Sequence, residues 1–553
     1  MKITDTGDLW WKTAVIYCLD IETYLDENGD GIGDLAGLAR RIDYLADLGI
    51  TCLWLMPFFP SPDRDDGYDI TDFYGVDPRI GSHGELVEVL RTARDRGIRV
   101  IIDLVVNHTS DKHPWFVSAR RSRTSPFRDY YVWRDEPPKT QQETVFPGEE
   151  SSVWELDEKS GQYFLHSFYS HQPDLNIANP RVRDEIAKVI GFWLQLGVSG
   201  FRVDAVPFLI EPPDGVDMGD PHEFLRDIKR FLQRRSSEAV VLGEVNVPYK
   251  DQLEYFGGSR GGELDLQFDF MSMQAMYLSL VRSDPAPLIR TLTSRPVIPP
   301  ETAWANFVRN HDELTLDKLT EKQKQEVFEA LSPDPSQRVY DRGITRRLPP
   351  MLAGDPRRVR MVYSLLFSLP GVPVLFYGEE IGMGENADIE GRLAVRTPMQ
   401  WAPDDKGGFS RAAASRFPAP IPGDGYAPRH VNVADQRNDD GSLLNFIRHL
   451  ASRYRLSPEI GWGEFEVLPQ DAPGVLVHSL RADVGRMIAL HNFADVPAVA
   501  RLQLADEPDD VRLRDLFSAE ALAPEAGKRF EIELPPYGYR WLRVARPGDT
   551  RLG

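Results

Sequence analysis

Apolar residues recur along most of the chain in two alternating patterns, short continuous runs and longer stretches with helical spacing. The short runs predict eight strands, at residues 15–20, 50–57, 99–108, 197–206, 239–246, 264–270, 303–312 and 372–380. Helical stretches lie between most of them, for example at residues 35–48, 85–96, 182–196 and 221–235. Eight strands separated mostly by helices predict an α/β fold, a (β/α)8 TIM barrel.

Long connections divide this predicted barrel into domains, because ordinary barrel loops are short. The segment after the third strand is rich in aromatic residues, Pro and Ser and is interpreted as an inserted domain. The segment after the seventh strand is interpreted as a helical lid, since residues 316–331 show a charged helical pattern. The final segment has short alternating runs that predict an all-β sandwich. The expected division is barrel 1–108 and 179–458, inserted domain 109–178, lid 313–350 and C-terminal sandwich 459–553.

Composition limits the classes of partner. The net charge is −21 at pH 7 and no basic run offsets it, which argues against nucleic acid and anionic membranes. No apolar run reaches the length of about 18 residues that a membrane span needs. The N-terminus lacks an apolar signal core, and Cys18 and Cys52 are expected to be reduced core residues, as in a cytoplasmic protein. The oligomeric state, a homo-oligomer included, is left open.

Charged residues stand where the fourth predicted strand ends. Arg202 and Asp204 are two positions apart, so both side chains point to the same face of a strand. One interpretation is a buried pair that satisfies itself. The other is a carboxylate kept ionised by a guanidinium so that it can act as a nucleophile.

Two further strands end in carboxyl groups. The fifth ends at Glu244, where an apolar surrounding would raise the pKa of the carboxyl and allow it to donate a proton. The seventh ends in His311 and Asp312, although Asp312 alone could be a helix cap. Cleavage of an acetal needs one carboxylate nucleophile and one carboxylic acid on opposite sides of the bond. Three carboxyl groups at one barrel mouth therefore indicate glycoside chemistry.

The motifs around these residues resemble those of the α-amylase superfamily, glycoside hydrolase family 13. The similarity lies in residues 103–108 (Asp-Leu-Val-Val-Asn-His), 200–206, 243–246 and 307–312, and in 537–544 near the C-terminus. The resemblance implies that Asp204 is the nucleophile, Glu244 the general acid/base and Asp312 the transition-state stabiliser. It further implies that Arg202 keeps Asp204 ionised, and that the sugar is bound by Tyr68, His108 and His311.

Finer motifs indicate a branch of that family. Gln172-Pro-Asp-Leu-Asn176 resembles the oligo-1,6-glucosidase and trehalose synthase branch, and Gln172 is expected to bind substrate. In that branch Asp69 and Arg396 would form a charged pair that holds the 4-hydroxyl of a terminal glucose and closes the pocket. A loop salt bridge is the alternative for Arg396. Residues 204–211, with Ala205 after the nucleophile, are most similar to trehalose synthases, whereas 18–24 and 386–392 depart from them.

Two calcium sites are predicted. In the loop 26–34, oxygen ligands stand at spacings that suit calcium, although a plain Gly-rich turn with solvated acids is the alternative. These ligands are Asp26, Asn28, Asp30, the carbonyl of Ile32, and Asp34. By resemblance to the family, Asn107 and Asp174, with Glu211, form a second site between barrel and inserted domain. No zinc cluster or dinucleotide motif is found, so no organic cofactor is expected.

These observations favour a retaining enzyme that transfers α-glucosyl groups through a covalent glucosyl-enzyme and interconverts maltose and trehalose. The alternative is an exo-acting α-glucosidase or transglucosidase that hydrolyses α-glucosides such as maltose or sucrose, which the departures at 18–24 and 386–392 leave open. Either would take a small sugar, a disaccharide, as substrate. A non-catalytic glucan-binding relative ranks last, because such relatives usually lack the three carboxylates.

Overall fold

A computed structural model describes residues 3, 9–138, 143–210, 219–518, 520–547 and 549. Eight parallel strands close into a barrel in the order β1-β14-β10-β9-β8-β7-β3-β2, which confirms the predicted fold. Their bounds are β1 Ile16–Leu19, β2 Cys52–Leu55, β3 Arg99–Leu104, β7 Gly200–Val203, β8 Val240–Gly243, β9 Leu266–Phe268, β10 Ala303–Phe307 and β14 Val372–Phe376. Nearly every strand residue is buried, as expected for a parallel sheet covered on its outer face by helices.

Strand register sets which side chains share a layer at the barrel mouth. Arg202 on β7 lies opposite Asp103 on β3 and opposite Leu242 on β8. Residues that pair across parallel neighbours point to the same face, so Arg202 and Asp103 both enter the barrel interior. Asp204 and Glu244 directly follow β7 and β8, at the carboxyl ends where barrel active sites lie.

The outer helices begin and end at clear capping signals. α4 (Pro180–Leu196) has Asn179 as its N-cap and Gly197 after its last residue, with φ at 113°. The other helices of eight or more residues in the barrel are α1 Leu35–Leu48, α2 His83–Asp95, α6 Glu223–Arg235, α8 Phe270–Arg282, α9 Ala286–Thr293, α12 Pro356–Ser368 and α14 Leu443–Arg455. Shorter ones are α5 Val206–Ile210, α7 Tyr249–Tyr255, α11 Leu348–Met351, α13 Val433–Arg437 and α15 Glu459–Trp462.

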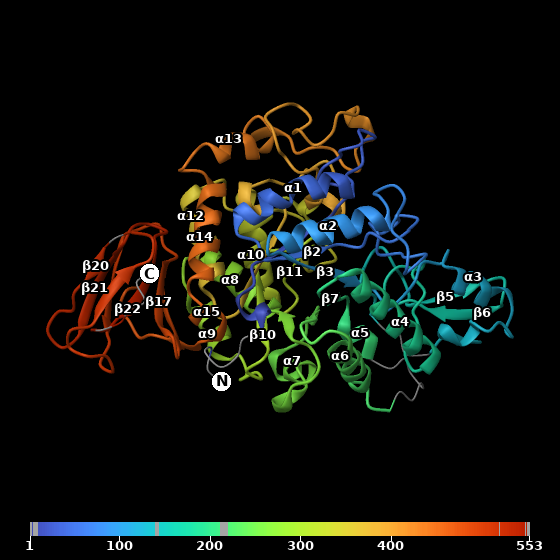
Figure 1. The fold of residues 1–553 in the computed structure, drawn as a ribbon, viewed down its shortest axis with the longest axis horizontal. Helices are drawn as coiled ribbons and strands as arrows, with labels where there is room; N and C mark the ends of the chain where they lie inside the picture. The colour runs from blue at the N-terminus through green and yellow to red at the C-terminus, as the bar shows by residue number, and fades with distance from the viewer. Residues whose placement is uncertain are drawn as a thin grey trace.

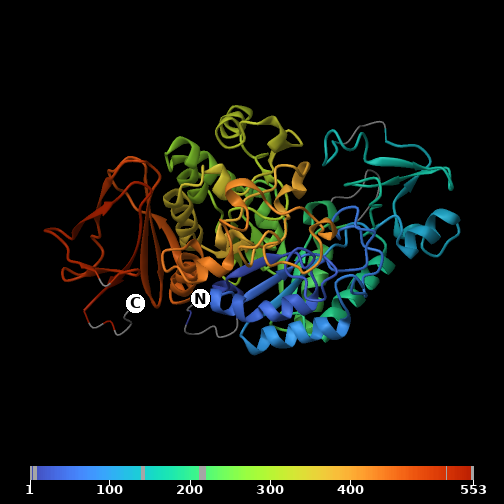
Figure 2. The ribbon, with the colours of Figure 1, turned by 90° about the horizontal axis from the view of Figure 1, so that it is seen from above.

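The segment between β3 and α4 forms a small unit beside the barrel. It holds α3 (Pro114–Arg121) and a three-stranded antiparallel sheet in the order β4-β6-β5. The strands are β4 Trp133–Arg134, β5 Trp154–Asp157 and β6 Gln162–Leu165. Val132, Val153, Trp154 and Leu165 form a separate core there. Both views place this unit on the side of the barrel opposite the C-terminal sheets (Figures 1 and 2).

The segment 313–350 contains one helix and a small antiparallel sheet. The helix α10 (Glu321–Leu331) begins later than the predicted start at 316, because Thr320 and Gln323 form a capping box there. Around it lie β11 Leu314–Thr315, β12 Arg338–Val339 and β13 Gly343–Ile344, in the order β11-β13-β12. The predicted helical lid is therefore part helix and part sheet.

Two antiparallel sheets form the C-terminal domain, as predicted. One has the order β15-β16-β17-β22-β19-β20 and the other pairs β18 with β21. The bounds are β15 Glu464–Val467, β16 Val475–Ala482, β17 Gly485–Asn492, β18 Ala498–Gln503, β19 Arg512–Asp515, β20 Ala521–Leu522, β21 Arg529–Leu534 and β22 Tyr539–Ala545. Cys18 and Cys52 are free and buried in the barrel. Among the described helices, none combines the length and apolarity needed to cross a bilayer.

Candidate active site

The three candidate carboxyl groups meet at one cavity. Asp204, Glu244 and Asp312 line a hollow of about 510 Å³ at the carboxyl ends of β7, β8 and β10, together with Tyr68 and His108. A volume of this size is typical of small-molecule sites. The structure thus brings together the residues that the sequence had placed on three separate strands.

Arg202 forms ion pairs with two of these carboxyl groups and with Asp103. The side chain is fully buried, and its Nη1 lies 2.5 Å from Asp204 Oδ1 and 2.6 Å from Asp103 Oδ1. Its Nη2 lies 2.8 Å from Glu244 Oε2, and its guanidinium is 5.1 Å from the ring of Trp54. One cation is therefore shared among three carboxyl groups, so the arrangement is not a self-satisfying pair. Asp103, which the sequence analysis gave no role of its own, is part of it.

The two reacting carboxyl groups differ in pKa. Burial raises the pKa of Asp204 to about 6, while Arg202 opposes the rise. Burial raises the pKa of Glu244 to about 7, also against Arg202. Glu244 Oε2 accepts a hydrogen bond from the backbone N–H of Ala205 at 3.1 Å, and Ala205 has a φ of 47°. The group with the lower pKa suits a nucleophile and the group with the higher pKa suits a proton donor.

Asp312 stays ionised for the opposite reason. Burial favours its protonated form, but His311, Arg392 and Arg396 together hold the pKa of Asp312 well below its usual range. Burial lowers the pKa of His311 in turn, and the neighbouring Asp312 opposes that fall. Arg396 Nη2 lies 2.9 Å and Arg392 Nη1 3.0 Å from Asp312 Oδ1. A fixed carboxylate of this kind can stabilise a positively charged transition state.

The predicted pair between Asp69 and Arg396 does not form. Asp69 is fully buried and turns into its own loop, where it accepts hydrogen bonds from Ser61 Oγ and from the backbone N–H groups of Arg64 and Asp65. Arg396 Nη1 instead lies 2.5 Å from Asp66 Oδ2. The prediction of a direct pair was wrong because the hydrogen-bond donors to the Asp69 carboxylate come from its own loop, while Arg396 pairs with Asp66.

Asp65, Asp66 and Arg392 were missed as site residues. Arg392 forms ion pairs with Asp65 and Asp312, and Gln172 Nε2 donates to Asp65 Oδ2 at 2.8 Å. The two consecutive acidic residues before Gly67 could have indicated these ion pairs, because adjacent carboxylates in a loop repel each other unless cations lie nearby. Arg392 lies in the segment 386–392 that departs from trehalose synthases, so this departure reaches the cavity itself.

Tyr68 and the two histidines form a buried group beside the carboxylates. Tyr68 Oη lies 2.7 Å from His311 Nε2, and the two rings are nearly parallel, 5.5 Å apart. His108 Nε2 lies 3.2 Å from the carbonyl of Tyr68, and burial lowers the pKa of His108 to about 4. Tyr68 and His108 line the cavity, whereas His311, Arg202, Gln172, Asp69 and Arg396 lie behind its lining.

The segment 313–350 and the inserted unit meet across the outer part of this cavity. Arg342 donates to the carbonyl of Val145 at 2.7 Å and lies 3.0 Å from Glu313 Oε1. The ring of Tyr340 packs against Phe146 at 5.0 Å. Phe168 lies 6.1 Å from Phe146 and contacts Phe208 at 5.1 Å. Aromatic side chains thus line the part of the cavity beyond the candidate carboxyl groups.

The first predicted metal loop is tightly curled. Asp26 accepts hydrogen bonds from Gly29 N–H at 2.5 Å and Gly31 N–H at 2.8 Å. Asn28 and Asp30 each accept from the N–H two residues ahead, and Asp34 caps α1. Burial, with a contribution from Asp26, raises the pKa of Asp34, so these two carboxylates lie close enough to repel. Across the described residues, no set of three or more His, Cys, Asp and Glu side chains is arranged to hold a metal.

At the second predicted metal site, the predicted ligands form hydrogen bonds with each other and with a neighbouring residue. Asn107 Nδ2 donates to Asp174 Oδ1 at 3.2 Å, and Asp174 also accepts from the N–H of Ser167 at 3.0 Å. Burial raises the pKa of Asp174 to about 7. Glu211, the third predicted ligand, lies outside the described residues.

Comparisons with known proteins agree with this geometry. The family model described as the α-amylase catalytic domain matches residues 21–331 and 345–460. A model described as the sucrose hydrolase-like C-terminal domain matches residues 485–543. The chain is 38% identical to a trehalose synthase of Pimelobacter sp. (strain R48), over 98% of this chain and 97% of that protein.

Other relatives and structures extend the comparison. A trehalose synthase of Thermus thermophilus is 41% identical over 98% of this chain, which spans only 56% of that protein. An oligo-1,6-glucosidase of Parageobacillus thermoglucosidasius is 30% identical over 98% of this chain and all of that protein. Among solved structures, the α-amylase from H. orenii has a TM-score of 0.79 at 26% identity, covering 97% of this chain and 100% of that one. The trehalulose synthase MutB from Pseudomonas mesoacidophila MX-45 has a TM-score of 0.76 at 26% identity, covering 98% and 100%.

Proposed function

This chain belongs to the α-amylase family, and from that premise we propose that it interconverts maltose and trehalose by retaining α-glucosyl transfer. The single observation that carries the proposal is the set of Asp204, Glu244 and Asp312 around one cavity, with Arg202 shared among the first two and Asp103. The trehalose synthases at 38–41% identity over nearly the whole chain support the choice of substrate.

We infer a role for each carboxyl group from its pKa and its neighbours. Asp204 has a pKa of about 6 and is therefore mostly ionised at pH 7. Its carboxylate attacks the anomeric carbon of the donor glucose. Glu244, with a pKa of about 7, protonates the oxygen of the departing glucose. A covalent glucosyl-enzyme forms, and Asp312 stabilises the positive charge that develops on the ring. After the released glucose has turned, Glu244 removes the proton from its 1-hydroxyl; that oxygen attacks the anomeric carbon of the glucosyl group, the bond to Asp204 breaks, and trehalose is formed.

Isomerisation requires that the freed glucose stays while water is kept out. Contacts between 313–350 and the inserted unit, through Arg342 and Tyr340, bring the two segments together beside the cavity, where a further approach would close it. A closed site of this kind sequesters a reactive intermediate from hydrolysis. An enzyme with the same donor side and a more open acceptor side would be an α-glucosidase, and the position of Arg392 in the departing segment 386–392 keeps that candidate in view.

Product analysis separates the two candidates. Purified protein is incubated with maltose and the products are resolved by anion-exchange chromatography, with the Asp204→Asn variant as control. Trehalose as the main product, formed by the wild type alone, supports the isomerase. Free glucose with no trehalose, again absent from the control, would replace the isomerase by the α-glucosidase. Maltose left unchanged by the wild type would contradict both.

We further propose that the loop 26–34 holds a structural calcium ion. The residue types suit the ion, because Asp26, Asn28, Asp30 and Asp34 place hard oxygen atoms in one short loop, and repulsion from Asp26 contributes to the raised pKa of Asp34. Binding would require these oxygens to give up their hydrogen bonds to the N–H groups of the loop. Calcium would neutralise this repulsion and fix the connection between β1 and α1. A second ion near Asn107 and Asp174 and a cytoplasmic location remain predictions, the latter supported by two free cysteines.

A further inference from the structure

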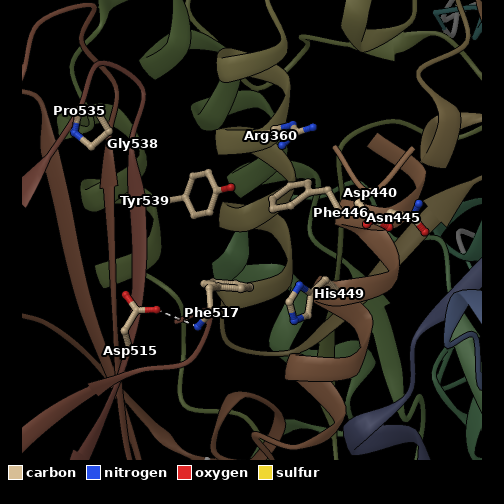
Figure 3. A pocket seen from close by; sticks show the side chains of 10 residues that line it. All are labelled: Arg360, Asp440, Asn445, Phe446, His449, Asp515, Phe517, Pro535, Gly538 and Tyr539. Atoms are coloured by element: carbon tan, nitrogen blue, oxygen red, sulfur yellow. Dashed lines mark hydrogen bonds between the residues drawn. The ribbon is translucent and has the colours of Figure 1, made fainter. Parts of the chain in front are cut away.

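A second hollow lies between the last barrel helix and the C-terminal sheet. It has a volume of about 470 Å³ and shares no lining residue with the catalytic cavity. Figure 3 shows three aromatic rings around it, Phe446 from α14 and Phe517 and Tyr539 from the C-terminal domain. The rings of Phe446 and Tyr539 are 5.5 Å apart, and those of Phe517 and Tyr539 are 6.0 Å apart. All three side chains are half-buried, so each keeps part of its surface open.

Free hydrogen-bonding groups stand among these rings. The hydroxyl of Tyr539, the ring nitrogens of His449 and the carboxylate of Asp440 make no hydrogen bond with any described residue. Asn445 donates its side-chain N–H groups to backbone carbonyls, and its Oδ1 accepts nothing from the described residues. His449 and Asp440 are exposed at the rim. Donors and acceptors of both kinds are thus available beside apolar ring faces.

The charged groups that line the hollow are of both signs, the cation Arg360 and the carboxylates Asp440 and Asp515, so they do not select an anion. Arg360 is engaged with the carbonyl of Gly441 and with the ring of Phe446, 5.3 Å away. Burial and Arg453 lower the pKa of His449, so its imidazole is neutral near pH 7. Asp515 is paired with Arg540, and the carboxylate of Asp440 is left unpaired among the described residues. A neutral ligand rich in hydroxyl groups fits these surroundings better than a phosphate or a nucleotide.

We propose that this hollow is a second, non-catalytic binding site for neutral α-linked glucose chains. Glucopyranose carries its hydroxyl groups at the ring edge, so both ring faces are apolar and can stack on Phe446, Phe517 or Tyr539. The edge hydroxyls would then reach Asp440, Asn445 and His449. The choice of glucose among the neutral pyranoses rests on the proposed function. The suitability of the hollow for a neutral sugar does not, because it follows from the aromatic rings and hydrogen-bonding groups that line the hollow.

A cyclic glucan tests the site without involving the catalytic cavity. β-Cyclodextrin consists of α-1,4-linked glucose and has no chain end that could enter a closed pocket. Titration calorimetry of the full-length wild type with β-cyclodextrin is expected to show one site per chain. Tyr539→Ala should weaken the Kd by about fivefold or more, the effect of losing one stacking ring, and Asp440→Asn should weaken it less. Tyr539→Phe, which keeps the ring, and Tyr163→Ala on β6, far from the hollow, are the matched controls.

Two further readouts decide the outcome. Turnover of maltose should be unchanged in all these variants, and β-cyclodextrin should not inhibit it. Absence of β-cyclodextrin binding to the wild type would overturn the proposal, as would binding that neither Tyr539→Ala nor Asp440→Asn weakens, or binding that competes with maltose. If Tyr539→Ala fails to fold, the exposed His449→Ala takes its place. Because binding is measured apart from catalysis, a wild type that binds β-cyclodextrin but makes no trehalose would refute only the proposed function.

Discussion

At the scale of single residues, the site depends on one guanidinium shared by three buried carboxyl groups. Arg202 can neutralise only one of the three negative charges of Asp103, Asp204 and Glu244, which favours retention of a proton among them near neutral pH. The pKa order places that proton on Glu244, whose pKa of about 7 exceeds the value of about 6 for Asp204 and Asp103. The same network therefore keeps the nucleophile charged and the donor protonated.

The nucleophile assignment predicts the effect of Asp204→Asn. A neutral amide cannot form the glucosyl-enzyme, so turnover of maltose should fall by about 10⁴-fold or more. Arg202 keeps its contacts with Asp103 and Glu244, so the fold should persist, as judged by circular dichroism and the melting temperature. Turnover within tenfold of the wild type would remove Asp204 from the role.

The pKa order also predicts a narrow pH optimum. Below the pKa of Asp204, about 6, the nucleophile gains a proton, and above the pKa of Glu244, about 7, the donor loses one. Because the two groups interact, the two limbs report apparent values for the pair. A plot of kcat/KM for maltose against pH should be bell-shaped between these values, and Glu244→Gln should lose the alkaline limb of its residual activity. Activity that keeps rising to about pH 9 would contradict the assignment of Glu244.

Substitution of Arg396 should reduce activity, whereas substitution of Asp69 should reduce stability. Arg396→Ala removes a cation from Asp312 and from Asp66, so kcat/KM for maltose should fall by roughly ten- to two-hundredfold, as expected for about 1.5–3 kcal/mol. Asp69→Asn disturbs only the loop 61–69, so it should lower the free energy of unfolding by about 1–3 kcal/mol with little change in kcat. Steady-state kinetics and urea unfolding of both variants check this. The reverse pattern would restore Asp69 to the substrate pocket.

The candidate site shows what a sequence can and cannot predict at this scale. Asp204, Glu244 and Asp312 were identifiable because each follows an apolar strand, and strand ends meet at one face of a barrel. The partner of Arg396 was not identifiable, because the loop conformation decides whether Asp66 or Asp69 faces it. Asp66 has a positive φ of 50°, a local detail that no spacing rule gives.

At the scale of elements, the hydrophobic pattern of the sequence predicted where strands and helices lie better than it predicted where they begin and end. All eight barrel strands lie inside the apolar runs, because burial on both faces requires continuous apolar residues. The strands are shorter than those runs, since the polar residues at their carboxyl ends leave the ladder to form the site. The start of α10 was missed because a capping box, not the charge pattern, determines it. The small sheet of β11, β12 and β13 pairs segments too short for any periodicity to mark.

The loop between β1 and α1 carries a prediction about calcium. An ion that binds only the folded state stabilises it by mass action, by about 2.7 kcal/mol at a hundredfold excess over Kd. A chelator should therefore lower the melting temperature, and added calcium should restore it. Asp30→Ala removes one ligand from an exposed position and should abolish this response, whereas Asp184→Ala on α4 should retain it. A chelator response that persists in Asp30→Ala would place any ion elsewhere, for example near Asn107 and Asp174.

At the scale of the whole molecule, the barrel carries the inserted unit on one side and the C-terminal sheets on the other (Figure 1). The inserted unit and the segment 313–350 complete the catalytic cavity. Among the described residues the C-terminal domain contributes none to that cavity, and it packs on the barrel mainly through α12 and α15. The second hollow, which this domain lines together with α14, shares no lining residue with the catalytic cavity.

Two stacked histidines lie buried where the C-terminal sheet meets α12. His478 Nε2 lies 2.8 Å from the carbonyl of Ser368, and His491 Nε2 lies 3.0 Å from Ser364 Oγ, which also accepts from Trp541 Nε1. The two imidazole rings are nearly parallel, 6.0 Å apart. Burial lowers the pKa of His478 to about 4, and burial together with His478 lowers the pKa of His491 further. Both are therefore neutral in the folded protein at pH 7.

From these two neutral, buried histidines we expect the protein to become less stable as the pH falls. Between about pH 6.5 and pH 4 the unfolded chain binds protons at these positions and the folded chain does not, so stability falls as the pH falls. For His478 alone the loss is on the order of 3 kcal/mol across that window. Urea unfolding at several pH values checks this, with His478→Gln as the non-titrating variant of similar size. The pH dependence should be shallower in His478→Gln and shallower still with His491→Gln added. Identical slopes in wild type and double variant would show that other groups govern acid unfolding.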